Sequence, residues 1–368
     1  YLKPFSLNHA TFELKCGIWT NLDRIKFYYS KEQGYPEEVK FILLVRPEIE
    51  SIITYRYPDM IVNPKIILKG KYINGRYLLK RQCDLDIFPE GPTDDDLIND
   101  SLIPLKYIWD LILHSKEIFE DDFDYFSAVY CYMNQIPGKK WSSIFGHPKD
   151  EPTAIAESAY IKEGVILDAS NGPILINNDV TVDIGALLQG PLFIDDGSYI
   201  APGAKLHPGT MIGKNCKVGG EVSNSIFYAN SNKVHDGFIG DSFIGEWVNI
   251  GAGTNNSNLK NNYSNVKFSF NGKDSIDTGH QFLGAMIGDY TRIGISSMLN
   301  TGTYIGLGAN VFGSRFQDKH IQSFSWGRDG IKTDFDKFIE TCQKMYSRRD
   351  EELLETEINF LRFLYNKK

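Results

Sequence analysis

Aliphatic residues recur at every sixth position through the middle of the chain, and this period restricts the possible folds more than any other feature. A helix repeats near 3.6 residues and a strand near 2, so neither element alone produces a period of about six. The period instead predicts a solenoid of hexapeptide repeats, in which each repeat contributes one short strand to a coil. The unbroken run consists of Ile176, Val182, Leu188, Ile194, Ile200, Leu206, Ile212 and Val218.

The same step appears before and after this run. Gly, Asn or Asp follow many of the anchors, as in the segment Ile212-Gly213-Lys214-Asn215. These residue types tolerate the positive φ that a tight corner needs, so we expect them at the corners of the coil. The further anchors are Ile155, Ile161 and Leu167, then Phe238, Ile244 and Ile250, and finally Ile287, Ile293, Leu299, Ile305 and Val311.

Residues 1–140 differ from the solenoid, because they mix β-branched runs with turn signals and helical spacing. This mixture favours an α/β domain. The apolar residues between Trp109 and Phe119 follow a helical period, which predicts a helix that covers a core face. The runs that we interpret as strands are 40–45, 52–55, 65–69 and 77–79.

Three further parts follow this domain. Residues 141–153 are rich in Pro and Gly and form the expected linker, and the solenoid covers 154–330. Residues 331–368 carry apolar side chains on one stripe, which predicts an amphipathic C-terminal helix with a break near 347–350. The predicted fold is therefore an α/β N-terminal domain, a solenoid and a C-terminal helix.

Composition excludes two classes of partner. The net charge is −8 and the basic residues are spread along the chain, so there is no electrostatic footprint for nucleic acid. The apolar runs, such as 41–45, are far shorter than the roughly 20 residues that a membrane span needs.

Five cysteines without zinc-type spacing favour a reducing, cytoplasmic setting. The chain starts at Tyr1 without Met or a signal segment, which favours a natural chain that begins further upstream.

The hexapeptide period breaks at two places, 219–236 and 253–280. Interruptions of a solenoid are where loops leave the coil and where function tends to lie. We therefore expect two loops at these places. The second segment contains an unusual density of Asn between Asn255 and Asn262.

His235, at the end of the first interruption, is the candidate catalytic residue. An imidazole that titrates near neutrality is a suitable general base for an amine or hydroxyl that attacks an acyl group. The resulting oxyanion needs an N–H donor, and backbone amides in 251–253 are the candidates. The alternative is that His235 only caps a turn. The remaining histidines are interpreted as structural: His9, His114, His147, His207, His280 and His320.

Other polar residues near these interruptions are candidate ligand contacts. Lys233 and Lys260 offer charge for a substrate phosphate, and Glu221 is placed to orient His235 or to bind a sugar hydroxyl. Carboxamides offer paired donors and acceptors for a sugar or for an amide-bearing cofactor arm. The alternatives are solvated lysines, a surface glutamate and asparagines that only form solenoid corners. The candidate carboxamides are Asn249, Asn256 and Asn258.

The N-terminal domain offers weaker signals for chemistry. It contains neither a Walker pattern nor a GxGxxG loop for nucleotide phosphates. Asp84, Asp86 and the run 94–96 offer carboxylates for Mg²⁺, but an acidic loop is more often only solvated. We therefore assign no site residues to this domain.

Two segments of the solenoid resemble a known family. Residues 233–240 and 245–254 are similar to the acetyltransferase half of the bacterial bifunctional N-acetylglucosamine-1-phosphate uridyltransferase/glucosamine-1-phosphate acetyltransferase. The chain resembles more closely the sugar nucleotidyltransferases related to that enzyme. Their hallmark stretches correspond to 219–222, 231–233 and 257–263, and the likeness extends to 2–7 and 12–17.

The resemblance implies a left-handed parallel β-helix that forms a homotrimer, with acetyl-CoA bound between subunits. By position, His235 matches the general base, Asn249 and Phe238 match sugar-phosphate contacts, and Ala252 and Asn258 match coenzyme contacts. Together with the residues argued from the sequence itself, the candidate substrate-binding residues are Glu221, Asn232, Lys233, Phe238, Asn249 and Lys260. The candidate coenzyme-binding residues are Ala252, Gly253 and Asn258.

Three positions depart from the family pattern. Ala201 and Ser223 stand where the bifunctional enzyme has basic residues, and Leu259 replaces an aromatic residue. The Gly-rich loop of the uridyltransferase is also absent. The acceptor phosphate contact and nucleotide transfer are therefore the least supported parts of the resemblance.

These observations predict acetyl transfer from acetyl-CoA to an amino sugar phosphate or a nucleotide sugar. The first alternative is a sugar-1-phosphate nucleotidyltransferase that uses Mg²⁺ in the N-terminal domain, with the solenoid serving for trimerisation. The second is a non-catalytic binding or assembly protein.

Overall fold

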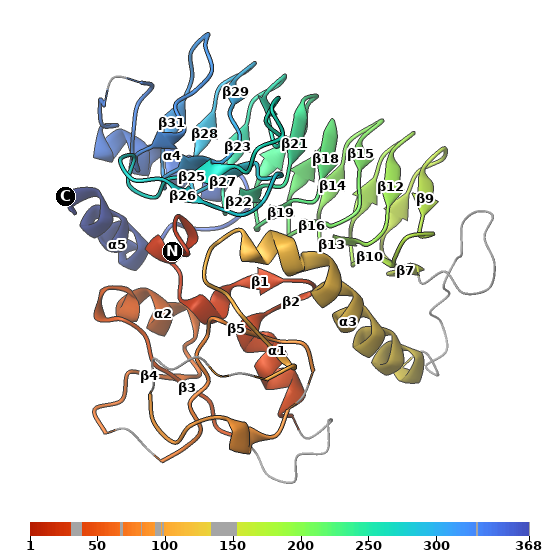
Figure 1. Ribbon diagram of the computed structural model, residues 1–368, viewed down its shortest axis with the longest axis vertical. Coiled ribbons are helices and arrows are strands. Elements are labelled where there is room, and N and C mark those ends of the chain that lie inside the picture. The colour runs from red at the N-terminus through yellow and green to blue at the C-terminus, as the bar shows by residue number, and fades with distance from the viewer. Residues whose placement is uncertain are drawn as a thin grey trace.

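The computed structural model describes residues 1–30, 39–66, 69–81, 83–92, 97, 99–133, 153–328 and 330–367, without the side chains of 125–133. A column of stacked strands forms one half of the molecule, and the N-terminal part lies along its side (Figure 1). The expected linker, 141–153, lies outside the described residues except for Thr153, where the first strand of the column begins. The boundaries predicted for the four parts stay predictions.

The column is a parallel β-solenoid with three sheets, as predicted. From β7 to β21 each coil contributes one strand to each sheet, and all neighbouring strands within these sheets run parallel. The first sheet contains β7 (Thr153–Ile155), β10 (Ile174–Ile176), β13 (Leu192–Ile194), β16 (Thr210–Ile212), β19 (Ile226–Phe227), β22 (Phe243–Ile244), β27 (Ala285–Ile287), β30 (Thr303–Ile305) and β32 (His320–Ile321).

The other two sheets follow the same order along the column. The second sheet contains β8 (Tyr160–Ile161), β11 (Thr181–Val182), β14 (Tyr199–Ile200), β17 (Lys217–Val218), β20 (Asn232–Lys233), β23 (Asn249–Ile250), β28 (Arg292–Ile293) and β31 (Asn310–Val311). The third contains β9 (Ile166–Asp168), β12 (Leu187–Gln189), β15 (Lys205–Leu206), β18 (Glu221–Ser223) and β21 (Phe238–Gly240). A separate pair, β24 (Asn255–Asn256) and β29 (Met298–Leu299), follows along the chain.

The predicted anchors form the core of the column. Ile176 pairs with Ile194, and Ile194 pairs with Ile212, so one coil consists of three hexapeptides and every third anchor stacks in the same sheet. All eight anchors from Ile176 to Val218 are buried in a single apolar cluster. The hexapeptide period therefore encodes both the burial and the strand register.

The first interruption is not a loop, which corrects the prediction for 219–236. Met211 pairs with Ile226, and Ile226 pairs with Phe243, so partners in neighbouring strands lie closer together along the chain than in the earlier coils. The chain stays in all three sheets and only shortens its coils, which shifts the hexapeptide frame. The inward residue of β21 is accordingly Ile239, and Phe238 is not an anchor but faces outward.

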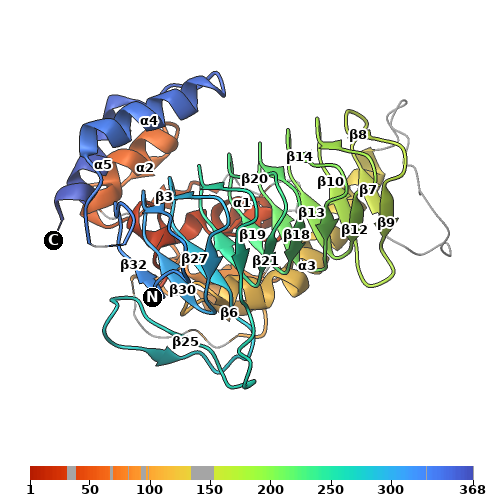
Figure 2. The same ribbon diagram turned by 90° about the horizontal axis from the view of Figure 1, so that it is seen from above.

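The second interruption is a true excursion. Phe243 pairs with Met286, although a long stretch of chain separates them, so one coil carries an inserted segment. This segment contains the antiparallel pair β25 (Lys267–Phe268) and β26 (Ile276–Asp277), which projects from the column (Figure 2). The ring of Phe268 packs against Trp109 at 5.1 Å, so the excursion also contacts the N-terminal part.

The N-terminal part mixes helices and strands, as predicted, but its described strands pair only in twos. The run 52–55 forms a helix rather than the expected strand, because Ile52 and Ile53 bury one side of a short helix. The described part of 65–69 forms no strand. The elements are β1 (Lys15–Cys16), β2 (Trp19–Thr20), α1 (Asn21–Tyr28), β3 (Ile42–Leu43), α2 (Glu50–Arg56), β4 (Ile61–Val62), β5 (Tyr77–Leu79), β6 (Leu102–Pro104) and α3 (Asp110–Met133), with short 3-10 turns between them.

Helix α3 and the N-terminal segment cover the outer face of the first sheet (Figure 1). Outward side chains of that sheet, such as Phe193 and Met211, share one apolar cluster with Ile112 and Phe119 of α3. The rings of Phe119 and Phe193 are 6.1 Å apart. The N-terminal part and the column therefore share a core. No helix among the described residues is long and apolar enough to cross a bilayer.

The C-terminal segment forms two helices, α4 (Phe335–Ser347) and α5 (Glu355–Asn366), with the break where it was predicted. Tyr346 of α4 stacks on Trp247 of the column at 4.2 Å. Phe360 of α5 packs in one cluster with Ile52 and Ile53 of α2. The two helices therefore join the late coils to the N-terminal part (Figure 2).

Candidate functional site

His235 lies at the corner between β20 and β21, where the chain turns from the second sheet to the third. Its side chain is exposed, and the imidazole has no hydrogen-bond partner among the described residues. The corner continues through Gly237, whose φ of 122° favours glycine. A Cβ at this position would lie 2.1 Å from the carbonyl oxygen of Thr254, so the corner packs tightly against the next coil.

The next coil places a second predicted segment directly beside this corner. Asn249 pairs with Asn232 in the second sheet. The amide of Gly253 donates a hydrogen bond to the carbonyl of Asp236 over 2.9 Å. The corner 251–253 is therefore stacked on the corner that carries His235.

One backbone N–H in the corner 251–253 has no hydrogen-bond acceptor in the part of the chain that the structure describes. Gly251 donates its N–H to the carbonyl of Ile293 over 2.8 Å, and Gly253 donates to Asp236. The N–H of Ala252 has no hydrogen-bond acceptor among the described residues. This corner thus offers one backbone donor for a ligand oxygen.

Phe238 and Asn258 lie on the third-sheet side of the same two coils. Phe238 donates its backbone N–H to Asn255 Oδ1 over 2.8 Å. Asn258 donates its amide to Asp241 Oδ2 over 2.6 Å. Five of the predicted contacts therefore lie on two adjacent coils with His235: Phe238, Asn249, Ala252, Gly253 and Asn258.

Asn256 has a structural task instead of the predicted ligand contact. Its Oδ1 accepts the N–H of Gly240 over 2.7 Å, and its Nδ2 donates to the carbonyl of the same residue over 2.9 Å. The side chain continues the backbone ladder across a coil. This role accounts for part of the high asparagine content.

Lys233 is buried inside the column, although the sequence suggested a phosphate contact. It pairs with Val218 and occupies an inward position of the second sheet, where its exposure is 1%. Its ammonium donates to the carbonyl oxygens of Gly219 at 3.0 Å and of His235 at 2.7 Å. Burial lowers the pKa of Lys233 to about 8, although Asp236 acts in the opposite direction. The side chain therefore fixes the backbone at the His235 corner.

Three other predicted substrate contacts already have partners in the protein. The carboxylate of Glu221 lies 3.2 Å from His207 Nε2, so it pairs with His207 rather than orienting His235. Asn232 accepts a hydrogen bond from Arg349 over 3.3 Å. Lys260 donates to Asn265 and Ser264 within its own loop.

The two described carboxylates considered for Mg²⁺ already have partners within the protein. Asp84 accepts the N–H of Asp86 and begins a 3-10 turn at Leu85–Ile87. Asp86 forms an ion pair with Lys71 at 3.2 Å. The run 94–96 lies outside the described residues.

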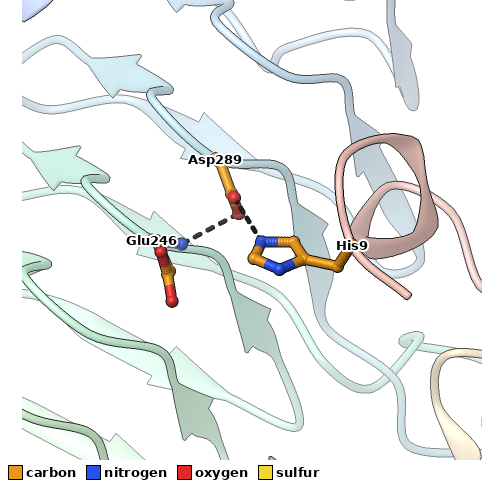
Figure 3. A group of neighbouring side chains, drawn as sticks. All are labelled: His9, Glu246 and Asp289. Atoms are coloured by element: carbon orange, nitrogen blue, oxygen red, sulfur yellow. Dashed lines mark hydrogen bonds and ion pairs between the residues drawn. The ribbon is translucent and has the colours of Figure 1, made fainter. Parts of the chain in front are cut away.

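A polar cluster that the sequence did not predict lies where the N-terminal segment meets the column (Figure 3). It contains His9, Glu246 and Asp289, whose ligand atoms all lie within 4.8 Å of one another. His9 Nε2 lies 2.8 Å from Asp289 Oδ2, and the N–H of Glu246 donates to Asp289 Oδ1 over 2.9 Å. The only signal in the sequence is that both acids follow an Ile-Gly pair, Ile244-Gly245 and Ile287-Gly288.

Charged neighbours shift the titration of this cluster. Arg56 Nη1 lies 3.1 Å from both carboxylate oxygens of Glu13, which lies 3.4 Å from His9 Nδ1. Burial and the Arg56 charge lower the pKa of His9, but Asp289 and Glu13 outweigh them and raise it to about 9. Burial raises the pKa of Glu246 to about 7.

A cavity of about 470 Å³ opens beside the cluster, between the N-terminal part and the column. Side chains from both parts line it, including Lys15, Trp19, Arg56, Tyr57, Asp195 and Glu246. Lys15 forms an ion pair with Asp195, and Trp19 stacks on Phe27 at 4.8 Å. The cavity is thus bordered by paired charges and aromatic rings.

The curated proteins to which the chain is similar are enzymes of the kind that its motifs resemble, and no protein-family model matches the chain. The bifunctional sugar-1-phosphate nucleotidylyltransferase/acetyltransferase of Sulfurisphaera tokodaii is 36% identical over 143 residues, which cover 38% of this chain and 35% of the relative. The chain is similar to the bifunctional sugar-phosphate nucleotidyltransferase/acetyltransferases. The bifunctional protein GlmU of Methanococcus vannielii is 31% identical over 221 residues, or 59% of this chain and 52% of the relative.

The similarity has a limited extent. The bifunctional protein GlmU of Wigglesworthia glossinidia brevipalpis is 33% identical, but the match covers 28% of its length. The chain therefore spans about a third of the length of the first two curated relatives. Among solved structures, AntD, an N-acyltransferase from Bacillus cereus in complex with dTDP and coenzyme A, is 12% identical with a TM-score of 0.19, covering 54% of this chain and 90% of that chain. A score of this size carries no argument about fold or function.

Proposed function

We propose that the protein transfers an acetyl group from acetyl-CoA to the amine of an amino sugar phosphate or a nucleotide sugar. The observation that carries this proposal is the stacking of two corners. The exposed imidazole of His235 lies on one corner, and the uncommitted N–H of Ala252 lies on the corner stacked against it. A general base and an oxyanion donor are the two groups that acyl transfer needs from a protein.

The reaction follows from these two groups. His235 accepts a proton from the acceptor amine while the amine nitrogen bonds to the thioester carbonyl carbon. The N–H of Ala252 donates a hydrogen bond to the carbonyl oxygen as negative charge develops there. The carbon–sulfur bond then breaks, and the imidazolium of His235 returns its proton to the departing thiolate of CoA.

The ligand contacts are assigned from the surfaces that border the two corners. Asn249 is exposed and Phe238 is half-buried, so both present side chains to an acceptor sugar. Gly253 and Asn258 lie on the coenzyme side. Glu221, Asn232 and Lys260 contact a substrate only if they exchange their present protein partners.

A homotrimer fits the exposed apolar side chains of the column. Ile166 and Leu187 are neighbours on the third sheet and are 53% and 39% exposed, and Ile295 at a later corner is 75% exposed. Neighbouring exposed apolar side chains favour a contact site. The resemblance implies that the coenzyme cleft lies between two copies. Sedimentation equilibrium tests the assembly, and a monomer at micromolar concentration would contradict it.

The test of the proposed function measures CoA release with acetyl-CoA and a set of amino sugar phosphates and nucleotide amino sugars. We expect turnover with at least one acceptor and a loss of about 100-fold or more in kcat for His235→Ala. The matched control is His207→Ala, which removes another part-exposed imidazole from the column. Equal turnover of His235→Ala and the wild type would reject the assignment.

The second candidate is sugar-1-phosphate nucleotidyl transfer with Mg²⁺ by the N-terminal part. It is supported by the name of the Sulfurisphaera tokodaii relative, which includes this activity. Pyrophosphate release from a nucleoside triphosphate and a sugar phosphate would support it. If the protein binds acceptor sugars and releases neither CoA nor pyrophosphate, the non-catalytic interpretation gains support.

The free, buried thiols of Cys16, Cys216 and Cys342 agree with the reducing cytoplasm that we propose as the location of the protein.

A further inference from the structure

We propose that His9, Glu246 and Asp289 form a binding site for one divalent transition-metal ion at the junction of the N-terminal segment and the solenoid. The site is independent of the proposed acyl transfer, because it lies on the first-sheet side of the column and shares no residue with the His235 corner.

The three side chains converge from separate parts of the chain. Their ligand atoms lie within 4.8 Å of one another, and His9 Nε2 lies 2.8 Å from Asp289 Oδ2. An ion bound at about 2.0–2.2 Å from nitrogen and oxygen ligands requires ligand atoms roughly 3 Å apart. Figure 3 shows the imidazole directed at Asp289, with Glu246 beside it. Small side-chain movements therefore suffice to form the site.

The solenoid fixes the two carboxylates relative to each other. Ile244 pairs with Ile287, so Glu246 and Asp289 occupy equivalent positions in consecutive coils. The N–H of Glu246 also donates to Asp289 Oδ1 over 2.9 Å. The spacing of these two ligands is thus set by sheet register rather than by a flexible loop.

Other residues hold the ligands from behind, as in many protein metal sites. Asn8 Nδ2 donates to Asp289 Oδ2 over 2.7 Å. His9 Nδ1 lies 3.1 Å from Arg56 Nη1 and 3.4 Å from Glu13, and Nε2 is the ring nitrogen on the Asp289 side. Arg56 in turn holds Glu13. A carboxylate behind an imidazole is a common arrangement for orienting a ligating histidine.

Two oxygen-bearing groups at the cluster lack partners. The carboxylate of Glu246 makes no hydrogen bond or ion pair with any described residue. Asn8 is 4% exposed, and its Oδ1 is buried with no hydrogen-bond partner among the described residues, although its Nδ2 contacts Asp289. A buried oxygen such as Asn8 Oδ1 normally has a partner. Glu246 is half-buried and lines the cavity, so its carboxylate is open to a ligand. A cation beside Asp289 would give the Glu246 carboxylate a partner.

The charges of the cluster also favour a dication. When Glu246 is ionised, Glu13, Glu246 and Asp289 carry three negative charges, whereas Arg56 carries one positive charge. With a neutral, ligating His9, one divalent ion brings the sum to zero. One imidazole and two carboxylates suit Zn²⁺ or Mn²⁺ better than Ca²⁺. Glu246 also lines the cavity of about 470 Å³, so the remaining coordination positions are accessible to water or to a ligand oxygen.

The test titrates Zn²⁺ into the full chain after removal of metals with a chelator. We expect calorimetry to show one bound equivalent and Tm to rise with Zn²⁺ concentration, because an ion that binds only the folded state stabilises it. Glu246→Gln keeps the shape of the side chain and breaks no contact, and we expect it to bind Zn²⁺ at least about tenfold more weakly. The matched control is His207→Ala, which removes another imidazole beside a carboxylate and should bind as the wild type does.

The opposing explanation is an ion-pair network without a metal, in which His9 is an imidazolium between Asp289 and Glu13. This explanation expects Glu246→Gln to raise the Tm of the metal-free protein and expects no response of the wild type to Zn²⁺. Absence of binding to the wild type, or equal binding by Glu246→Gln, would overturn the proposal. If Glu246→Gln does not fold, Glu246→Asp provides the measurement, since it keeps the charge and is expected to weaken binding without abolishing it.

Discussion

The ammonium group of Lys233 donates a hydrogen bond to the carbonyl oxygen of His235, 2.7 Å away, from inside the solenoid. A second hydrogen bond of 3.0 Å goes to Gly219. The two bonds tie neighbouring corners together beneath the exposed imidazole. The buried lysine is thus a positioning residue for the proposed base rather than a contact for substrate.

The first prediction concerns Lys233→Met, which keeps the length and apolar stem of the side chain but removes both hydrogen bonds. We expect kcat for CoA release to fall about tenfold, because one or two hydrogen bonds of a charged donor are lost at the His235 corner. The KM for acetyl-CoA should change little, since Lys233 does not reach the surface. Lys217→Met, on the exposed face of the neighbouring strand, is the control. A change in KM with kcat intact would instead indicate a substrate contact.

The second prediction concerns the pH dependence of stability. Burial lowers the pKa of Lys233 from 10.5 to about 8, so between these values the unfolded chain binds more protons than the folded one. The free energy of unfolding therefore rises with pH in this window relative to a chain without the group. We expect the free energy of unfolding of the wild type to increase relative to that of Lys233→Met between pH 8 and about 10. Urea denaturation at several pH values measures it, and parallel curves would contradict it.

The third prediction uses Ala252→Pro to remove one backbone N–H. The equivalent position in an earlier coil is already a proline, because Ile200-Ala201-Pro202-Gly203 corresponds to Ile250-Gly251-Ala252-Gly253. The glycines that end both corners have similar φ values, 66° and 71°. The substitution should therefore leave Tm nearly unchanged and lower kcat about 100-fold through loss of the oxyanion donor. Ala252→Ser, which keeps the N–H, is the control, and full activity of the proline variant would exclude this donor.

The fourth prediction concerns the C-terminal helices. Deletion of 333–368 uncovers apolar side chains that α4 and α5 bury, including Trp247, Leu307 and Phe324. We expect increased binding of a hydrophobic dye and lower solubility. A deletion of 366–368 alone, which removes no member of this cluster, serves as the comparison. Unchanged dye binding and sedimentation of the longer deletion would refute the prediction.

The solenoid was predictable because a single type of residue sets both its burial and its register. The anchors from Ile176 to Val218 point inward in every coil, so their six-residue period predicts the stacked coils directly. The same period wrongly predicted a loop at 219–236. A shortened coil and a loop that leaves the coil interrupt the period in the same way. Only the strand pairing distinguishes them.

The N-terminal part and the polar cluster depend on contacts that a local pattern does not carry. Ile52 and Ile53 are β-branched, which suggested a strand, but burial against α5 outweighs this weak preference. His235, Asn249 and Ala252 could be proposed from the sequence because they lie in one short stretch of the chain. The other two members of the His9 cluster come from late coils of the column, and no local spacing relates them to His9.

The pairing of His9 with Asp289 joins positions that are far apart along the chain, so translation separates the two partners in time. Residues 9, 13 and 56 are synthesised before the coil that carries Asp289. A ribosome that stalls before Asp289 would therefore leave these charged side chains without the column surface that completes their surroundings.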